Sequence, residues 1–78
     1  MVELTVNERE VIRYGLYLHR NLRLKDVKYC LQCQYDLAIK VIRSLITKQM
    51  VNPRGTGSQR YHEYEILPLA GEYLLQKF

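Results

Sequence analysis

The clearest pattern of hydrophobic and polar positions lies in residues 34–48, near the middle of the chain. Its apolar residues recur at spacings of three and four, the period of an α-helix with one buried face. The buried face is predicted to contain Ala38, Val41, Ile42 and Leu45, with Ile39 and Ile46 on its flank. The opposite side is predicted to carry Asp36, Lys40, Arg43 and Thr47. A central helix with one charged, exposed side is therefore expected.

Residues before this segment predict a first helix. Thr5 followed by Glu8 is typical of a capping box, in which each residue bonds the backbone N–H of the other. Asn7 followed by Glu10 offers a second such box, so the helix is expected to begin at Thr5 or Asn7. Its apolar period continues to about residue 20.

A shorter helix is predicted between the first helix and the central one. Residues 22–24 form a brief extended link, which is long enough for a short strand. Residues 25–31 follow as the short helix, with Val27 and Leu31 four positions apart on its buried side. The break at residues 32–34 separates it from the central helix.

The pattern after residue 48 changes to that of a β-hairpin. Residues 50–53 predict a short strand, and its final proline confines that strand to the edge of a sheet. Residues 54–59 form a glycine-containing turn, and residues 60–67 predict the returning strand. A second proline then begins a last helix over residues 69–77.

Length and composition favour one small globular domain over residues 1–78. Hydrophobic residues make up 47% of the chain and charged residues 26%, without a low-complexity segment or an internal repeat. No apolar run approaches the roughly 18 residues that span a bilayer. Charges recur throughout residues 1–20, so a signal peptide is not expected either. We expect a cytoplasmic protein, associated with the nucleoid if its source is prokaryotic or viral.

The net charge of +4 is distributed unevenly. Residues 1–33 carry +2, residues 34–62 carry +4 and residues 63–78 carry −2. The positive charge is therefore concentrated in the central helix and the predicted hairpin, as suits a polyanionic partner. A solvated face without a partner is the alternative.

The order of elements resembles that of a winged helix-turn-helix domain, over nearly the whole chain. The residues that carry the resemblance are Val27 and Leu31 in the short helix, Cys33 in the turn, Ala38, Ile42 and Leu45 in the central helix, and Met50 and Val51 before the wing. Residues 66–74 are similar to the wing exit and following helix of MarR and PadR type regulators. The sequence departs from the pattern at Gln49, where glycine is usual, and at Leu67 or Pro68, where threonine is usual.

The resemblance implies an α+β winged helix: a three-helix core, a β-hairpin wing over residues 50–67 and a short C-terminal helix. It also implies binding of double-stranded DNA, with helix 34–48 as the recognition helix in the major groove. Residues flanking the glycine-rich tip of the wing would then reach the backbone or the minor groove. The candidate DNA-binding residues are Gln34, Tyr35, Asp36, Ile39, Lys40, Arg43, Thr47, Arg54, Ser58 and Arg60.

Two roles fit Asp36, which stands out because a carboxylate repels phosphate. It can accept a hydrogen bond from a cytosine amino group, or it can cap the recognition helix together with Gln34. The cap is the favoured interpretation, since a carboxylate in the first turn also suits the helix dipole.

Metal and cofactor sites are not expected. Cys30 and Cys33 have the spacing of half a zinc site or of a redox pair, but nothing in the pattern brings His19 and His62 to them. The two cysteines are interpreted as small apolar side chains near the helix-turn-helix turn, with a thiol switch as the alternative.

Catalysis is not expected either. Glu63 and Glu65 share one face of a predicted strand without a histidine companion. The glycines at residues 55 and 57 precede a strand rather than a helix, so they do not form a phosphate-binding loop. The sequence therefore favours a binding protein over an enzyme.

The hypothesis from the sequence is a small transcriptional regulator that acts as a homodimer and has no small-molecule substrate. Dimerisation is expected through the first helix and residues 69–78, notably through the apolar Leu74, Leu75 and Phe78. The alternative is a winged-helix module that docks on a protein or a ribonucleoprotein without sequence recognition. Four of the seven tyrosines, Tyr17, Tyr29, Tyr35 and Tyr61, are predicted to be exposed and suit either function.

Overall fold

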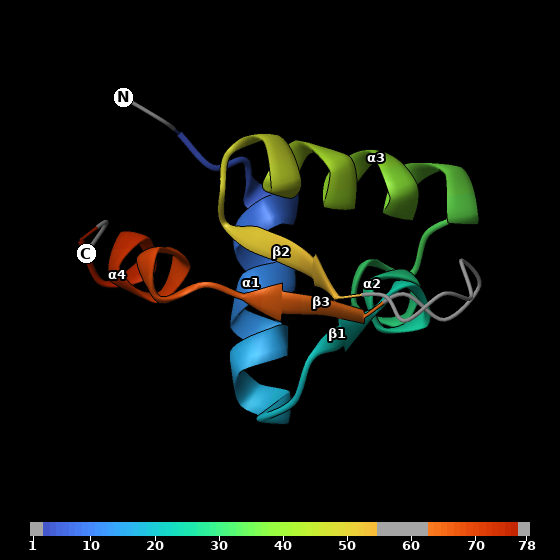
Figure 1. Ribbon diagram of the computed structural model, residues 1–78. Coiled ribbons are helices and arrows are strands. Elements are labelled where there is room, and N and C mark those ends of the chain that lie inside the picture. The colour runs from blue at the N-terminus through green and yellow to red at the C-terminus, as the bar shows by residue number, and fades with distance from the viewer. Residues whose placement is uncertain (1–2, 55–62, 77–78) are drawn as a thin grey trace.

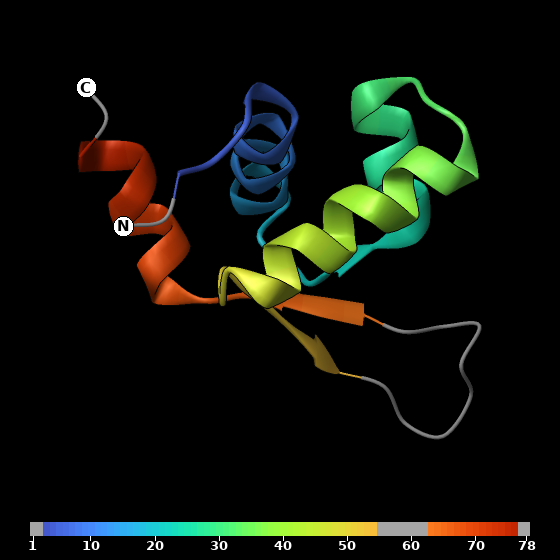
Figure 2. The same ribbon diagram turned by 90° about the horizontal axis from the view of Figure 1, so that it is seen from above.

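The computed structural model describes residues 3–54 and 63–76. Its elements are α1 (Val6–Leu18), β1 (Leu22–Arg23), α2 (Leu24–Leu31), α3 (Tyr35–Thr47), β2 (Val51–Arg54), β3 (Glu63–Ile66) and α4 (Pro68–Gln76) (Figure 1). The three strands form one antiparallel sheet in the order β1-β3-β2. Viewed from above, the sheet borders a bundle of α1, α2 and α3, and α4 follows β3 at one end (Figure 2). The expected α+β winged helix is confirmed.

Helix α1 begins at the first of its two possible caps. The Thr5 hydroxyl accepts a hydrogen bond from the Glu8 N–H at 3.2 Å, and the Glu8 carboxylate accepts one from the Thr5 N–H at 2.8 Å. The helix ends at Leu18, two residues earlier than its apolar period suggested. His19 adopts a left-handed conformation with φ of 57°, which closes the last turn.

Gln32 makes the turn between α2 and α3. Its φ is 50°, a left-handed conformation more typical of glycine or asparagine, and its N–H bonds the carbonyls of Lys28 and Tyr29. Helix α2 begins at Leu24, one residue before the expected start, directly after the two-residue strand β1. The predicted helix-turn-helix is therefore present with these shifted boundaries.

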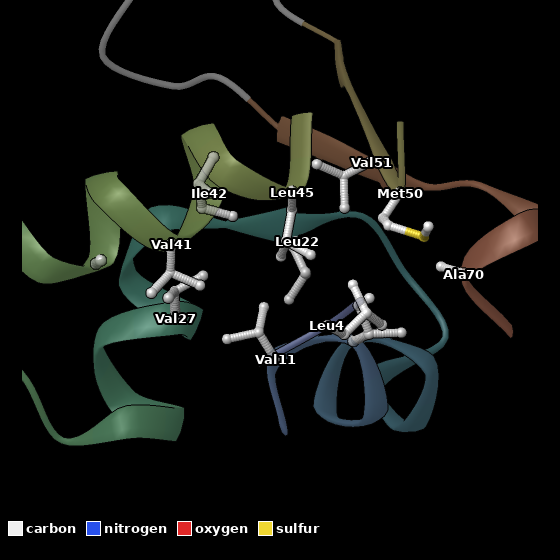
Figure 3. Packing of buried hydrophobic residues seen from close by; sticks show 12 residues of the cluster. Leu4, Val11, Leu22, Val27, Val41, Ile42, Leu45, Met50, Val51 and Ala70 are labelled. Carbon is white, nitrogen blue, oxygen red and sulfur yellow. The ribbon is translucent and has the colours of Figure 1, made fainter. Parts of the chain in front are cut away.

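The core confirms the buried face predicted for the central helix. Its four predicted positions are all buried, and they pack with residues from α1, α2, the sheet and α4 (Figure 3). The buried apolar residues are Leu4, Val11, Ile12, Leu22, Val27, Ala38, Val41, Ile42, Leu45, Met50, Val51 and Ala70. Enclosure by several elements holds α3 at a fixed place on the domain.

Strands β2 and β3 form the base of the wing. Val51 pairs with Ile66 and Arg54 pairs with Glu63 in an antiparallel register. β2 is an edge strand, as Pro53 requires, because a proline cannot donate to a ladder on both sides. The expected turn and the start of the expected second strand fall in residues 55–62, outside the described residues.

Helix α4 begins at Pro68, whose fixed φ suits the first helical position. Ala70 is fully buried, Leu74 packs half-buried against the core, and α4 contacts α1. The side chains of Leu75 and Phe78 lie outside the described residues. No helix within residues 3–54 and 63–76 has the length and apolarity to cross a membrane.

Candidate nucleic-acid interface

Helix α3 presents the predicted interaction surface on the side opposite the core. Six of its seven candidate residues are exposed, namely Gln34, Tyr35, Asp36, Lys40, Arg43 and Thr47. Ile39 is half-buried. The helix period places the six candidates within α3 on the side away from its buried face, and Gln34 precedes them at the N-cap.

Lys40 and Arg43 keep their positive charges open to solvent. Neither side chain forms an ion pair within the described parts of the chain. The third cation of this region, Lys48, is instead bound to the buried Glu8, with Nζ 2.6 Å from Oε1. Lys40 and Arg43 are thus the α3 cations available to an external anion.

The expected side-chain cap of α3 is not formed. Gln34 occupies the N-cap position with an extended backbone, φ −75° and ψ 162°, but its side chain makes no capping hydrogen bond. Asp36 lies exposed in the first turn, where its charge suits the helix dipole. The cap was the favoured interpretation of Asp36; its alternative, a contact with a cytosine amino group, stays a prediction.

Lys28 is a residue of this surface that the sequence pattern did not single out. Its Nζ lies 5.3 Å from the centroid of the Tyr35 ring, a cation–π distance. The contact joins the last turn of α2 to the first turn of α3 and adds a positive charge beside the recognition face. No local spacing in the sequence indicates this contact, because it depends on how α2 packs against α3.

A groove separates α3 from the wing. It has a volume of about 530 Å³, and its walls come from α2, α3, β2 and β3. Most of the lining residues are apolar, and one arginine and two tyrosines complete the set: Leu24, Tyr35, Ile39, Ile42, Arg43, Ile46, Pro53 and Tyr64. The half-buried Ile39 side chain is therefore part of the wall of this groove.

The wing contributes one described candidate. Arg54 is 59% exposed, and its Nε lies 3.2 Å from Oε1 of Glu65 on the neighbouring strand. An exposed pair of this kind contributes roughly 0–1 kcal/mol, so it competes weakly with a phosphate for the guanidinium. Ser58 and Arg60 fall outside the described residues, and their roles stay predictions.

Both cysteines are free thiols and both are half-buried. Cys33 packs against the core at the turn, as expected, and the Cys30 thiol lies 3.6 Å from the Glu10 carbonyl oxygen that it bonds. Burial, with smaller effects of Glu10 and Cys33, raises the pKa of Cys30, which disfavours the reactive thiolate. Within the described residues no three potential metal ligands come together.

Comparison with known proteins identifies the fold. No family model and no curated protein matches this sequence. Among solved structures, a mutant MepR from a multidrug-resistant Staphylococcus aureus isolate aligns with a TM-score of 0.79 at 17% identity, over 94% of this chain and 54% of that one. The adhesin competence repressor AdcR of Streptococcus pyogenes aligns with a TM-score of 0.77 at 21% identity, over 97% and 55%.

A complex of S. aureus MepR with DNA is also similar, with a TM-score of 0.72 at 16% identity, over 96% of this chain and 54% of that one. The chain therefore spans about half the length of these regulators. At such low identity the likeness concerns the fold, and it covers nearly every element described above. The chain has the winged-helix fold of the MarR type transcription regulators.

Proposed function

We propose that this chain binds double-stranded DNA sequence-specifically as a small transcriptional regulator, with α3 in the major groove and the wing on the backbone or in the minor groove. The observation that carries the proposal is the exposed charge of Lys40 and Arg43, which form no ion pair with any described residue, on the side of α3 opposite its buried face. A helix about 10–12 Å across fits a major groove about 12 Å wide. The proposal assigns no catalytic role to the chain.

The similar structures support this proposal at the level of architecture. MepR is a transcription regulator by name, and one of its structures is a complex with DNA. Their fold places a helix equivalent to α3 on a common scaffold, although fold alone does not imply function. A protein with the proposed function would act in the cytoplasm, and on the nucleoid if its source is prokaryotic or viral.

The proposal includes a homodimer, because two recognition helices about 34 Å apart would contact successive turns of B-DNA. The predicted contact lies at α1, α4 and the C-terminus, notably at Leu74, Leu75 and Phe78. Leu74 is half-buried against its own core, so only part of it is available to a partner. Leu69 on the same helix is 43% exposed and adds to the apolar surface.

The proposed function is tested by comparing two exposed arginines. The protein is titrated into a fluorescently labelled pool of random duplexes, and then into the best duplex selected from that pool. Fluorescence anisotropy gives the affinity for each. Arg43→Ala should weaken binding to the selected duplex about tenfold or more, as expected for a lost base contact. Arg13→Ala removes an arginine of α1 that is also exposed, and duplex affinity should stay within about twofold.

Equal effects of Arg43→Ala and Arg13→Ala, or no binding of any duplex by the folded protein, would contradict the proposal. Circular dichroism of each variant separates lost binding from lost structure. Competition with unlabelled single strands then distinguishes recognition of the duplex from attraction to any polyanion.

A second candidate function, docking on a protein, is favoured by a tyrosine cluster on α1 and α2. Tyr17 and Tyr29 are 77% and 73% exposed, and the Tyr14 ring lies between them, 6.5 Å and 6.1 Å from their ring centroids. The cluster borders a groove of about 450 Å³. Aromatic residues with polar tips are enriched at protein interfaces.

One pair of double variants separates the two functions. Tyr17→Ser/Tyr29→Ser removes the exposed rings of the cluster and leaves α3 intact, so duplex affinity should be unchanged if α3 binds the DNA. Lys40→Ala/Arg43→Ala should abolish duplex binding. If the tyrosine variant lost duplex binding and the α3 variant kept it, the assignment of the DNA-binding face would be wrong.

A further inference from the structure

One line of side chains on the exposed side of α3 combines apolar and charged groups. Tyr35, Ile39 and Arg43 follow one another at four-residue spacing, so they form a single ridge along α3. All three line the groove between α3 and the wing, where Pro53 stands opposite. Along the helix axis, this ridge therefore presents an aromatic ring, then a branched aliphatic side chain, then a guanidinium group.

Ile39 stands out among these because it is apolar beside exposed charges. Its side chain is half-buried and β-branched, and both features restrict its conformation. Leu37 is another apolar residue of α3 with an exposed side chain, but it projects from the other flank of the helix, away from this groove. A partner that enters between α3 and the wing therefore meets an aliphatic surface with a cation one turn away.

The major groove of DNA contains one apolar group that matches such a surface. Thymine carries a C5-methyl group there, whereas the other features of base edges are hydrogen-bond donors and acceptors. An isoleucine side chain cannot form a hydrogen bond with a donor or acceptor on a base edge. Burying such a group without a hydrogen-bond partner is unfavourable. Ile39 thus favours thymine and disfavours a base with a polar group at the same point.

We propose, on the basis of the proposed function, that the preferred DNA site contains a thymine whose methyl group contacts Ile39 and a guanine that pairs with Arg43. Four residues of helix rise about 6 Å, which is close to two base steps of about 3.4 Å. The guanine therefore lies within about two base steps of the thymine. Bidentate contact of arginine with guanine O6 and N7 accounts for the second preference.

The test removes the methyl group and leaves every hydrogen-bonding group of the base in place. A duplex is first selected from a random pool with the unmodified protein. Its thymidines are then replaced by deoxyuridine, together and one at a time, and affinity is measured for each. We expect replacement at the contacted position to weaken binding about fourfold, the effect of one buried methyl group, and replacement in the flanking sequence to have no effect.

Substitutions in the protein assign the effect to Ile39. The ratio of affinities for the thymine and uracil duplexes should fall to about one in Ile39→Ala, and Ile39→Val should retain most of it because its branched side chain still reaches the methyl. Lys40→Ala is the matched control: it should weaken both duplexes and leave their ratio unchanged. A double-mutant cycle of this form isolates the contact from general loss of affinity.

Each outcome decides the inference. A folded wild-type protein that binds thymine and uracil duplexes equally would overturn it while leaving the proposed DNA binding in place. A uracil effect that persists undiminished in Ile39→Ala would assign the methyl contact to another residue. Should Ile39→Ala fail to fold, the wild-type ratio and the Ile39→Val protein still decide. Absence of duplex binding altogether would overturn the proposed function and this inference with it.

Discussion

Glu8 in the first turn of α1 and Lys48 at the C-terminal end of α3 form an ion pair, with Nζ 2.6 Å from Oε1 across 40 residues of sequence. The Glu8 carboxylate, 2% exposed as a residue, also accepts hydrogen bonds from the Ser44 hydroxyl and the Thr5 N–H. Lys48 in turn donates to the Glu3 carbonyl at 2.7 Å. One carboxylate thus joins the start of α1 to the last turns of the recognition helix.

The first prediction concerns Lys48. Lys48→Met leaves the Glu8 carboxylate buried without its cation, and breaking a buried pair from one side typically costs about 3 kcal/mol or more. Urea unfolding should show this loss. Lys40→Met removes an exposed lysine of the same helix that forms no ion pair with a described residue, and it should change the free energy of unfolding by less than about 0.5 kcal/mol. If the two variants lost equal amounts of unfolding free energy, the Glu8–Lys48 pair would make no specific contribution to stability.

The second prediction is a loss of stability in acid. Burial raises the pKa of Glu8, but hydrogen bonds from Lys48, Ser44 and Thr5 outweigh this and hold it below the ordinary 4.5. The Arg20 guanidinium, bonded to both carboxylate oxygens at 2.8 Å and 3.0 Å, holds the pKa of Asp26 below the ordinary 3.8, against an opposing effect of burial. Both carboxylates therefore bind protons more weakly in the folded state than in the unfolded state.

The sign of the pH dependence follows from these depressed values. Stabilisation by Glu8 and Asp26 is complete above about pH 4.5 and is lost as the pH falls through their folded pKa values. Urea unfolding between about pH 7 and about pH 3 should show a stability that declines in the acid range. Asp26→Asn should be less stable at neutral pH and should have a shallower acid decline. An unchanged slope in that variant would contradict the role assigned to Asp26.

The local pattern of apolar and polar residues predicted the helices and strands, but it did not predict the long-range polar contacts. The period of Ala38, Val41, Ile42 and Leu45 correctly defined the buried face of α3, because burial and helix geometry both act at spacings of three and four. Glu8 was interpreted only as a partner in the capping box. Its second role depends on how α1 packs against α3, which no local spacing encodes.

Conformations that ordinary residues rarely adopt were also missed. Gln32 has a left-handed conformation with φ of 50°, and because it is neither glycine nor asparagine its residue type did not indicate the turn. Gln49, with φ of 63°, occupies the position where the resemblance expects glycine. For the interface, the exposed ridge of α3 could be predicted from its period. The contact of Lys28 with Tyr35 could not, because it depends on the packing angle of α2 against α3.

A third prediction contrasts two helical glycines. A Cβ atom at Gly15 would overlap Cδ1 of Ile66 and lie 2.9 Å from Cγ of Leu22, because α1 crosses the sheet there at close range. Gly15→Ala should destabilise the domain by about 1–3 kcal/mol through overpacking. At Gly71 in α4 a Cβ meets nothing within 4 Å, so Gly71→Ala should stabilise by up to about 1 kcal/mol. Thermal unfolding of both variants measures the contrast, and a stabilised Gly15→Ala protein would refute the close packing.

The fourth prediction concerns assembly. If α4 and the C-terminus form the homodimer contact, sedimentation of the protein at tens of micromolar should give the mass of two chains. Leu75→Asp should shift the protein to the monomer, since a charge at an apolar interface is costly to desolvate. Glu72→Gln on the exposed side of the same helix is the control and should leave the mass unchanged. A monomeric wild-type protein would exclude this dimer.

The fifth prediction separates base contacts from phosphate contacts by their salt dependence. Arg54 and Arg60 are predicted to bind phosphate, so each alanine substitution should reduce the slope of log K against log salt by about one and weaken all sequences similarly. Because Arg54 is paired with Glu65, its contribution to DNA affinity should be smaller at low salt, where that ion pair is least screened. Glu65→Gln frees Arg54 and removes a negative charge, so it should strengthen binding to every duplex.

Lys40 and Arg43 are expected to behave differently because they project from α3 toward the base edges. Alanine at either position should cost about 1–3 kcal/mol on the preferred duplex and less on random DNA, since the contact is lost only where the matching base is present. The ratio of specific to random affinity is therefore the decisive measurement, and Arg54→Ala is its control because that ratio should stay constant. If all four alanine variants remained folded and bound duplex DNA as well as the wild type, neither α3 nor the wing would be the DNA-binding surface, and docking through the tyrosine cluster of α1 and α2 would replace it.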